Sequence, residues 1–237
     1  MMFPEDLERE AAAIARNLAD VRTRADAAAL RAGRNPAEVT ILGVTKTKPA
    51  STVRAAAMAG IITIGENYVQ ELVAKHDELG DIVRWHMIGH LQRNKVRLVA
   101  PFVAMIHSVD SLRLAREIGL EASSLGRSIP VLLQVNTSGE ESKFGVEPGA
   151  VLELARSIAA LPGVELEGMM TIAAFLNDVE LLRPMFRLLR ELRDDAARAL
   201  GHPLPHLSMG MTHDFETAIE EGATLVRVGT ALFGLRN

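Results

Sequence analysis

The chain lacks several features on which whole classes of function depend. It has no cysteine, which excludes disulfides, thiolate metal sites and cysteine nucleophiles. Aromatic residues make up only 4% of the sequence, with one tryptophan and one tyrosine, so we expect no aromatic platform for stacking bases. The net charge of -4 provides no basic stripe for a nucleic-acid surface. We therefore predict no nucleic-acid partner and no metal site.

Long hydrophobic runs and a targeting segment are also missing. No apolar stretch reaches the length of a membrane span. The N-terminal residues MMFPED are acidic and lack the basic start and apolar core of a signal peptide. Apolar residues nevertheless make up 48% of the 237 residues, which is enough for a sizeable core. We expect a soluble, cytoplasmic protein without a membrane partner.

The chain does contain a regular alternation of apolar runs and helical patterns. Residues 4–31 are rich in alanine and carry apolar side chains at helical spacing, which predicts one long helix. Eight apolar runs then follow at a spacing of about 25 residues, each leading into a helical segment. We predict strands over residues 39–44, 61–64, 83–88, 103–107, 130–135, 164–170, 206–209 and 225–228.

This alternation predicts an α/β fold, a single (β/α)8 barrel of the TIM type with an extra N-terminal helix. A doubly wound open sheet is the alternative. The count of eight strands, with no glycine-rich dinucleotide fingerprint after the first one, favours the barrel. No linker or low-complexity segment divides the chain. Residues 1–237 are therefore predicted to be one domain, with the N-terminal helix in 1–36 and the barrel in 39–237.

A lysine follows the first predicted strand at the rim where barrel active sites lie. The apolar run from Val39 to Val44 leads directly to Lys46, and Pro49 prevents further strand pairing. A desolvated lysine amine can attack a carbonyl carbon and form a Schiff base. Strand residues alternate between two faces, so Val44 and Lys46 share a face and Lys48 lies beyond the strand. The alternative is that both lysines lie in a solvated loop without a chemical role.

Small residues follow the last two predicted strands, where barrels frequently bind phosphate. These are Ser208 and Gly210 on one strand, and Gly229 and Thr230 on the next. Backbone N–H groups in such loops can approach and bind a phosphate. Ordinary turn glycines with helix caps are the alternative, although the presence of both motifs on adjacent strands favours phosphate.

An arginine, Arg227, interrupts the last apolar strand, where a charge needs a partner. It either forms a buried ion pair with an acidic neighbour or donates to a ligand's ring nitrogen or phosphate. A lysine able to form a Schiff base, a phosphate cradle and this arginine in one barrel mouth together fit pyridoxal 5′-phosphate (PLP). PLP is the cofactor that we predict.

Six motifs in order carry a resemblance to a known family. They are VTKTKP (44–49), GENYVQE (65–71), HMIGHLQRNK (86–95), QVN (134–136), SMGM (208–211) and VRVGTALFG (226–234). With these motifs the sequence resembles the pyridoxal-phosphate homeostasis protein family, which is similar to the N-terminal barrel domain of alanine racemase standing alone. The resemblance covers about residue 39 to the C-terminus, and the leading helix matches only in type.

The resemblance implies a fold-type III PLP-binding barrel with the cofactor on Lys46. It implies a ring-nitrogen contact from Arg227, and a serine is commoner in the family at the position of Thr212, which keeps the hydroxyl. The phosphate contacts implied are Ser208, Gly210, Gly229 and Thr230, and the pocket lining implied is Asn67, His86, Asn136 and Met170.

Three classes of function are compatible with these motifs. An arginine at the ring nitrogen weakens PLP as an electron sink, and the second base of alanine racemase comes from an all-β domain that is absent from these 237 residues. The single tyrosine, Tyr68, is expected at a pocket wall or on the surface. We therefore expect a PLP-binding protein for intracellular PLP homeostasis, without a catalytic residue and with PLP-dependent apo-enzymes as candidate recipients. A weak PLP-dependent amino-acid racemase is the alternative, followed by an interaction scaffold with a vestigial site.

Overall fold

The computed structural model describes residues 4–140, 143–174 and 176–234, and it forms a closed barrel of eight parallel strands. Each strand pairs with its neighbours in the sequence, and β1 also pairs with β8, which closes the barrel. The predicted α/β barrel is thus confirmed. The strands are β1 (Thr40–Val44), β2 (Thr63–Glu66), β3 (Arg84–Met87), β4 (Met105–Val109), β5 (Ile129–Gln134), β6 (Val164–Met170), β7 (His206–Met211) and β8 (Leu225–Val228).

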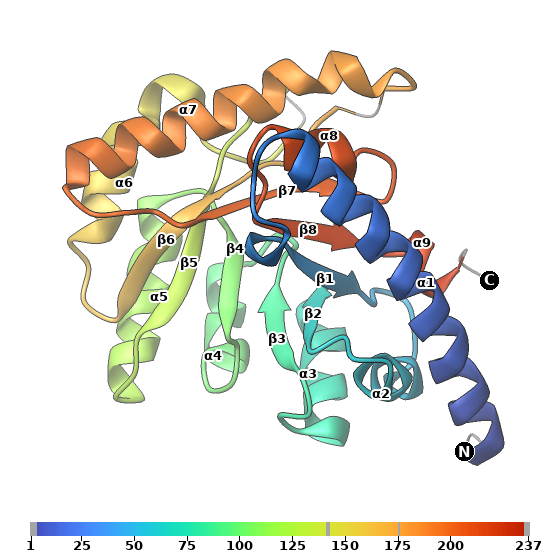
Figure 1. Ribbon diagram of the computed structural model, residues 1–237. Helices are drawn as coiled ribbons and strands as arrows, with labels where there is room; N and C mark the ends of the chain where they lie inside the picture. Colours follow the sequence, from blue (N-terminus) through green and yellow to red (C-terminus); the bar gives the residue numbers. More distant parts are fainter. Residues whose placement is uncertain (1–3, 141–142, 175, 235–237) are drawn as a thin grey trace.

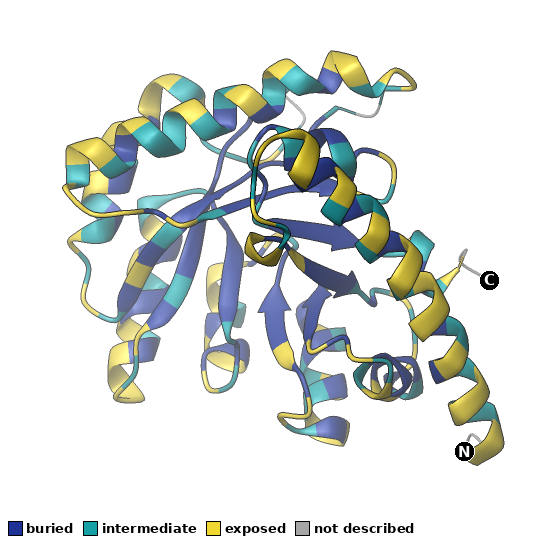
Figure 2. Cartoon of the chain, viewed as in Figure 1, coloured by how far each residue is buried: buried dark blue, intermediate teal, exposed yellow. Residues whose placement is uncertain are grey.

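Helices cover the outside of the barrel, and their outer faces are exposed while the strands are almost wholly buried (Figure 2). The α-helices are α2 (Ala50–Met58), α3 (Val69–Leu79), α4 (Val96–Val99), α5 (Leu112–Ser124), α6 (Val151–Ala159), α7 (Arg183–Leu200), α8 (Phe215–Glu220) and α9 (Thr230–Phe233). Short 3-10 helices are η1 (Pro36–Glu38), η2 (Arg93–Lys95), η3 (Pro148–Ala150) and η4 (Val179–Leu182). Within the described ranges, no helix has the length and apolar character needed to cross a membrane.

The predicted N-terminal helix is α1 (Pro4–Arg31), which lies across the outside of the barrel (Figure 1). Alanine favours the helix intrinsically, and one face buries Ile14, Val21, Ala25 and Ala28. This face packs against α2, α8 and α9. The helix therefore belongs to the barrel's outer layer and joins its first and last β/α units.

Two strands begin two residues later than the sequence predicts. For β2 the observed range is Thr63–Glu66, where 61–64 was predicted. A β-carbon on Gly65 would lie 2.3 Å from Leu42 Cδ2, so the crowded barrel interior requires glycine inside a strand, where the usual apolar signal is then absent. The other strand is β4, whose range is Met105–Val109 where 103–107 was predicted.

The barrel interior holds a separate apolar layer. Met105, Leu132, Met170 and Leu225 form a buried cluster of their own, apart from the core between strands and helices. They come from β4, β5, β6 and β8, which can meet only inside the barrel. This apolar layer and the polar residues near it separate the two ends of the barrel.

Candidate functional site

A cavity of about 570 Å³ opens at the carboxyl ends of the strands, and we call it the upper cavity. Five of the predicted site residues line it: Lys46, Asn67, Arg227, Gly229 and Thr230. The remaining lining residues are Val44, Ile88, Ile172, Ala174, Leu176, Leu182, Met211, Thr212, His213 and Asp214. Mostly apolar walls with a few convergent polar groups are typical of a cofactor site.

Both neighbours of Lys46 are anchored to the β2–α3 unit. Thr45 Oγ1 donates to Glu66 Oε1 at 2.5 Å, and the backbone N–H of Thr47 donates to Glu71 Oε2 at 2.8 Å. Thr47 has a φ of 66°, which is unusual for a residue other than glycine. The anchors at Thr45 and at the strained Thr47 fix the backbone on both sides of Lys46.

A buried ion pair supports these anchors. Lys75 Nζ lies 2.6 Å from Glu66 Oε1 and donates to the carbonyl oxygen of Thr45 at 2.8 Å. Glu66 is fully buried, and its burial raises the pKa of the carboxyl, while Lys75 and Thr45 lower it. This support was not predicted from the sequence, although the i,i+4 spacing of Glu71 and Lys75 was a signal for it.

Arg227 is buried in β8 and donates to two neighbours. Its Nη1 donates to Ser208 Oγ at 2.7 Å and its Nη2 to the carbonyl oxygen of Thr171 at 2.8 Å. Burial lowers the pKa of Arg227 to about 10, against the attraction of Asp214, so the guanidinium stays charged at neutral pH. Within the described residues it has no ion-pair partner, and the interpretation as a buried ion pair is not supported.

Ser208 lies inside the barrel and outside the residues that line the upper cavity. Its hydroxyl is fully buried between Arg227 and His107, whose Nδ1 lies 2.9 Å from Ser208 Oγ. His86, a predicted pocket residue, also lies below this cavity, with Nδ1 2.9 Å from His107 Nε2. The described residues therefore place both side chains in a polar chain under Arg227, and their contact with a cofactor stays a prediction.

Asn136 and Met170, two further predicted lining residues, also fall outside the upper cavity. Asn136 shapes the loop after β5, where its Oδ1 accepts from the N–H of Ser138 and its Nδ2 donates to the carbonyl oxygen of Glu140. Met170 is part of the apolar layer inside the barrel. The cavity contacts predicted for both residues are not observed among the described residues.

The two predicted phosphate glycines have different surroundings. Gly210 has a φ of 88°, and a β-carbon there would lie 2.6 Å from Ala218 Cβ, so glycine allows α8 to pack against β7. Gly229 lines the upper cavity, and its β-carbon would meet only Val44, at 3.4 Å or more. A β-carbon at Gly229 is therefore tolerated by the protein itself.

The loop after β7 contributes residues that were not predicted as site residues. Asp214, which is buried, accepts from the N–H of Met211 at 2.5 Å and so fixes the loop, and burial raises the pKa of its carboxyl. Between them lies Thr212, whose hydroxyl accepts from the N–H of Ala231 at 3.4 Å. In the sequence, the hydroxyl of Thr212 two residues after Gly210 was the signal that this loop contributes to the site.

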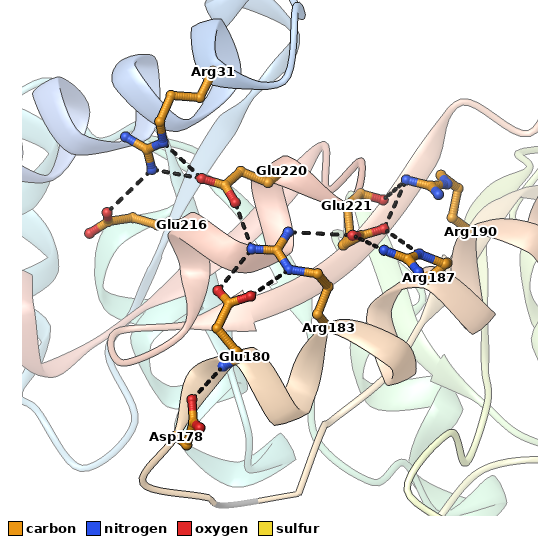
Figure 3. Close-up of polar contacts among 9 residues, drawn as sticks. All are labelled: Arg31, Asp178, Glu180, Arg183, Arg187, Arg190, Glu216, Glu220 and Glu221. Carbon is orange, nitrogen blue, oxygen red and sulfur yellow. Dashed lines mark hydrogen bonds and ion pairs between the residues drawn. The ribbon is translucent and has the colours of Figure 1, made fainter.

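A network of ion pairs lies next to Leu182 in the sequence and joins the elements around it (Figure 3). Leu182 lines the cavity, and the next residue, Arg183, contacts Glu180, Glu220 and Glu221 at 2.8 to 3.3 Å. Arg31 at the end of α1 reaches the same Glu220 at 2.8 Å. The network ties η4 and α7 to α8 and α1. The further ion-paired members are Arg187, Arg190 and Glu216, and Asp178 accepts a hydrogen bond from the backbone N–H of Glu180.

Comparisons with known proteins agree with this geometry. The family described as the N-terminal domain of alanine racemase matches residues 10–237. The pyridoxal phosphate homeostasis protein of Aquifex aeolicus is 47% identical over 220 residues, covering 92% of this chain and 96% of that protein. The protein of the same name from Escherichia coli K12 is 44% identical over 231 residues, covering 94% and 97%. The PLP-bound structure of PipY from Synechococcus elongatus PCC7942 matches with a TM-score of 0.82 and 36% identity, covering 93% of this chain and all of that one.

Proposed function

The chain belongs to the pyridoxal phosphate homeostasis protein family, and from that membership we propose that it binds PLP in the upper cavity and helps to keep the intracellular PLP level in balance. The observation that carries the proposal is the convergence of Lys46, Arg227 and Gly229 on one cavity at the carboxyl ends of the strands. The name of the relatives and the PLP bound to PipY support the same assignment.

The residues of the upper cavity fit PLP. Its volume of about 570 Å³ lies within the range of small-molecule sites. Arg227 has five N–H donors, and its two hydrogen bonds to Ser208 and Thr171 leave others for a ligand. The first turn of α9 leaves the N–H of Thr230 without an intrahelical partner, and the N–H of Thr212 has no acceptor among the described residues. These donors suit a phosphate beside Gly229.

We assign the covalent attachment of PLP to Lys46, as a Schiff base formed with loss of water. Lys46 lines the cavity, and its two flanking residues are fixed by Glu66 and Glu71. Held in this way, the lysine stem starts from one defined direction, which lowers the entropic cost of orienting its amine. When bound, PLP supplies an aldehyde carbon for the lysine and an electron-withdrawing ring.

Arg227 suits a holding role better than rapid catalysis. It can only donate, so a ring nitrogen that meets it must accept and stays unprotonated. This weakens the ring as an electron sink. Tyr68 is 53% exposed and does not line the upper cavity, so it does not supply a second base there. The residues present therefore bind and orient the cofactor, and we propose storage of PLP for apo-enzymes in the cytoplasm.

An absorption spectrum of the purified, PLP-loaded protein tests this proposal. We expect a visible band that disappears on treatment with borohydride. L- and D-amino acids are then added to the loaded protein, and turnover is measured. Turnover at about 1 per second or more would instead identify a racemase or another PLP enzyme. A protein that shows no such band with excess PLP contradicts the proposed function.

A further inference from the structure

A chain of hydrogen bonds runs from Arg227 down through the barrel. Arg227 Nη1 is 2.7 Å from Ser208 Oγ, which is 2.9 Å from His107 Nδ1, and His107 Nε2 is 2.9 Å from His86 Nδ1. All four side chains are at least nine-tenths buried. Burial lowers the pKa of His86 to about 3 and that of His107 well below its ordinary value, so both rings are neutral.

The direction of this chain follows from its first member. Arg227 can only donate, so Ser208 Oγ accepts from it. The serine hydrogen then has one acceptor among the described residues, His107 Nδ1. His107 therefore carries its hydrogen on Nε2 and donates to His86 Nδ1. The reverse order would leave the buried serine hydrogen without an acceptor, which is costly. His86 must carry its own hydrogen on Nε2.

His86 lines a second cavity, of about 1110 Å³, at the amino ends of the strands. We call it the lower cavity. Its walls include apolar residues from α1 and the strand starts, namely Leu18, Val39, Ile61, Met105 and Leu225. The Nε2–H of His86 has no acceptor among the described residues. A nine-tenths buried donor thus lies at this cavity without a protein partner.

The charged groups of the lower cavity favour an anion. Arg84 precedes His86 by two residues on β3, on the same face of the strand, and makes no side-chain hydrogen bond or ion pair with another described residue. Arg22 from α1 is a second cation, which donates to the carbonyl oxygen of Val39 and is paired with Asp26 at 3.7 Å, so within the described ranges Arg84 is the cation left for a ligand. Among the described lining residues Glu167 is the acidic one, and it lies 3.6 Å from His206 Nε2.

We propose that the lower cavity is a second ligand site, which takes a small molecule with a carboxylate and an apolar body. The carboxylate accepts from His86 Nε2–H and pairs with Arg84, while the apolar body lies against Leu18 and Ile61. The site is separate from the upper cavity and does not depend on PLP. The hydrogen-bond chain nevertheless links its floor to Arg227.

Hexanoate and its neutral isostere hexanamide are suitable probes. We expect saturable binding of hexanoate in the millimolar range by calorimetry, with hexanamide at least about tenfold weaker because it lacks the charge. Arg84→Gln, at an exposed position, should weaken hexanoate about tenfold. Arg113→Gln on α5 removes an exposed arginine outside the cavity and is the matched control. ¹⁵N-histidine spectra should show His86 protonated on Nε2, with that nitrogen shifting as hexanoate binds.

Three results would each overturn the proposal. The first is equal affinity for hexanoate and hexanamide, or no saturable binding of either. The second is hexanoate affinity that Arg84→Gln leaves unchanged. The third is a His86 ring protonated on Nδ1. All of these measurements are made on protein without PLP, so a result against the second ligand site leaves the proposed PLP-binding function untouched.

Discussion

Replacing Lys75 with methionine tests how the backbone around Lys46 is held. The side chain of Lys75 is only 7% exposed and that of Glu66 is not exposed at all. Lys75→Met keeps most of the apolar stem but removes the cation at 2.6 Å from Glu66 Oε1 and the donor to the carbonyl oxygen of Thr45. A buried carboxyl is left with Thr45 Oγ1 as its remaining donor, since Glu66 Oε2 has no partner.

Breaking a buried ion pair in this way costs about 3–5 kcal/mol of the free energy of unfolding. By contrast, the exposed pair of Arg9 and Asp6 on α1 should contribute at most about 1 kcal/mol, so Arg9→Met is the matched control. In Lys75→Met the loop that carries Lys46 also loses an anchor, the hydrogen bond to the carbonyl oxygen of Thr45. We therefore expect PLP affinity to fall in Lys75→Met as well, and to stay unchanged in Arg9→Met.

The loss in Lys75→Met should depend on pH. Burial already raises the pKa of Glu66 above 4.5, and removing Lys75 raises it further. A raised carboxyl pKa means that the native state binds a proton more tightly than the unfolded state. The stability associated with that proton is present at low pH and is lost as the pH rises through the native pKa. The deficit of the variant should therefore be largest at neutral pH and shrink toward pH 4.5.

Urea denaturation of the parent protein, Lys75→Met and Arg9→Met between pH 4.5 and 7.5 measures these changes in the free energy of unfolding. The double variant Glu66→Gln/Lys75→Met removes the buried charge, and we expect it to recover part of the stability at neutral pH. A Lys75→Met protein within about 0.5 kcal/mol of the parent at neutral pH would refute the reasoning, because surface substitutions have effects of that size.

Three further predictions concern the cofactor and the barrel interior. Pyridoxal should bind at least a hundredfold more weakly than PLP in equilibrium titrations, because it loses several charge-assisted hydrogen bonds of roughly 1.5–3 kcal/mol each. Gly229→Val should weaken PLP binding similarly. Equal affinities of the parent protein for pyridoxal and PLP would argue against a phosphate site beside Gly229. A folded, PLP-loaded Arg227→Glu variant should exchange the α-proton of an added amino acid in heavy water faster than the parent, as followed by NMR, because a glutamate stabilises a protonated ring nitrogen. An unchanged exchange rate would mean that Arg227 is not what limits catalysis and that the lack of a second base among the described residues of the cavity is sufficient to explain it. Because burial lowers the pKa of His86 to about 3, the free energy of unfolding should fall as the pH drops from 6.5 toward 3. His86→Phe should reduce the slope of the free energy of unfolding against pH by up to about 1.4 kcal/mol per pH unit. An unchanged slope would mean that His86 is not buried as described.

Much of the fold could be predicted because hydrophobic periodicity reflects burial directly. The ranges 164–170 and 225–228 coincide with β6 and β8, where apolar residues are the majority although Glu165, Glu167, Gly168 and Arg227 interrupt them. The range of β2 was displaced because Gly65 and Glu66 carry no apolar signal. The interior leaves no room for a side chain at Gly65, and Glu66 is buried by its pair with Lys75. Both reasons lie in contacts between different elements of the fold, with Leu42 of β1 and Lys75 of α3.

The site was predictable where a residue lies just beyond a strand end. Lys46, Asn67 and Gly229 line the upper cavity because the carboxyl ends of parallel strands meet at one rim. Ser208 and His86 carry the same kind of polar signal, yet they lie deeper, where they bond to His107. The sequence alone does not distinguish these depths, because a hydroxyl or imidazole satisfied inside a barrel has the same pattern as one that faces a ligand.

The central claim, that Lys46 holds PLP, is tested most directly by fixing the cofactor with borohydride and identifying the modified lysine by peptide mass spectrometry. Spectra of Lys46→Ala, Lys48→Ala and the double variant accompany the measurement. We predict the reduced cofactor on Lys46 in the parent protein, loss of its visible band in Lys46→Ala, and retention of the band in Lys48→Ala. Modification of another lysine in the parent, or a band that persists in Lys46→Ala at the parent's strength, would contradict the claim.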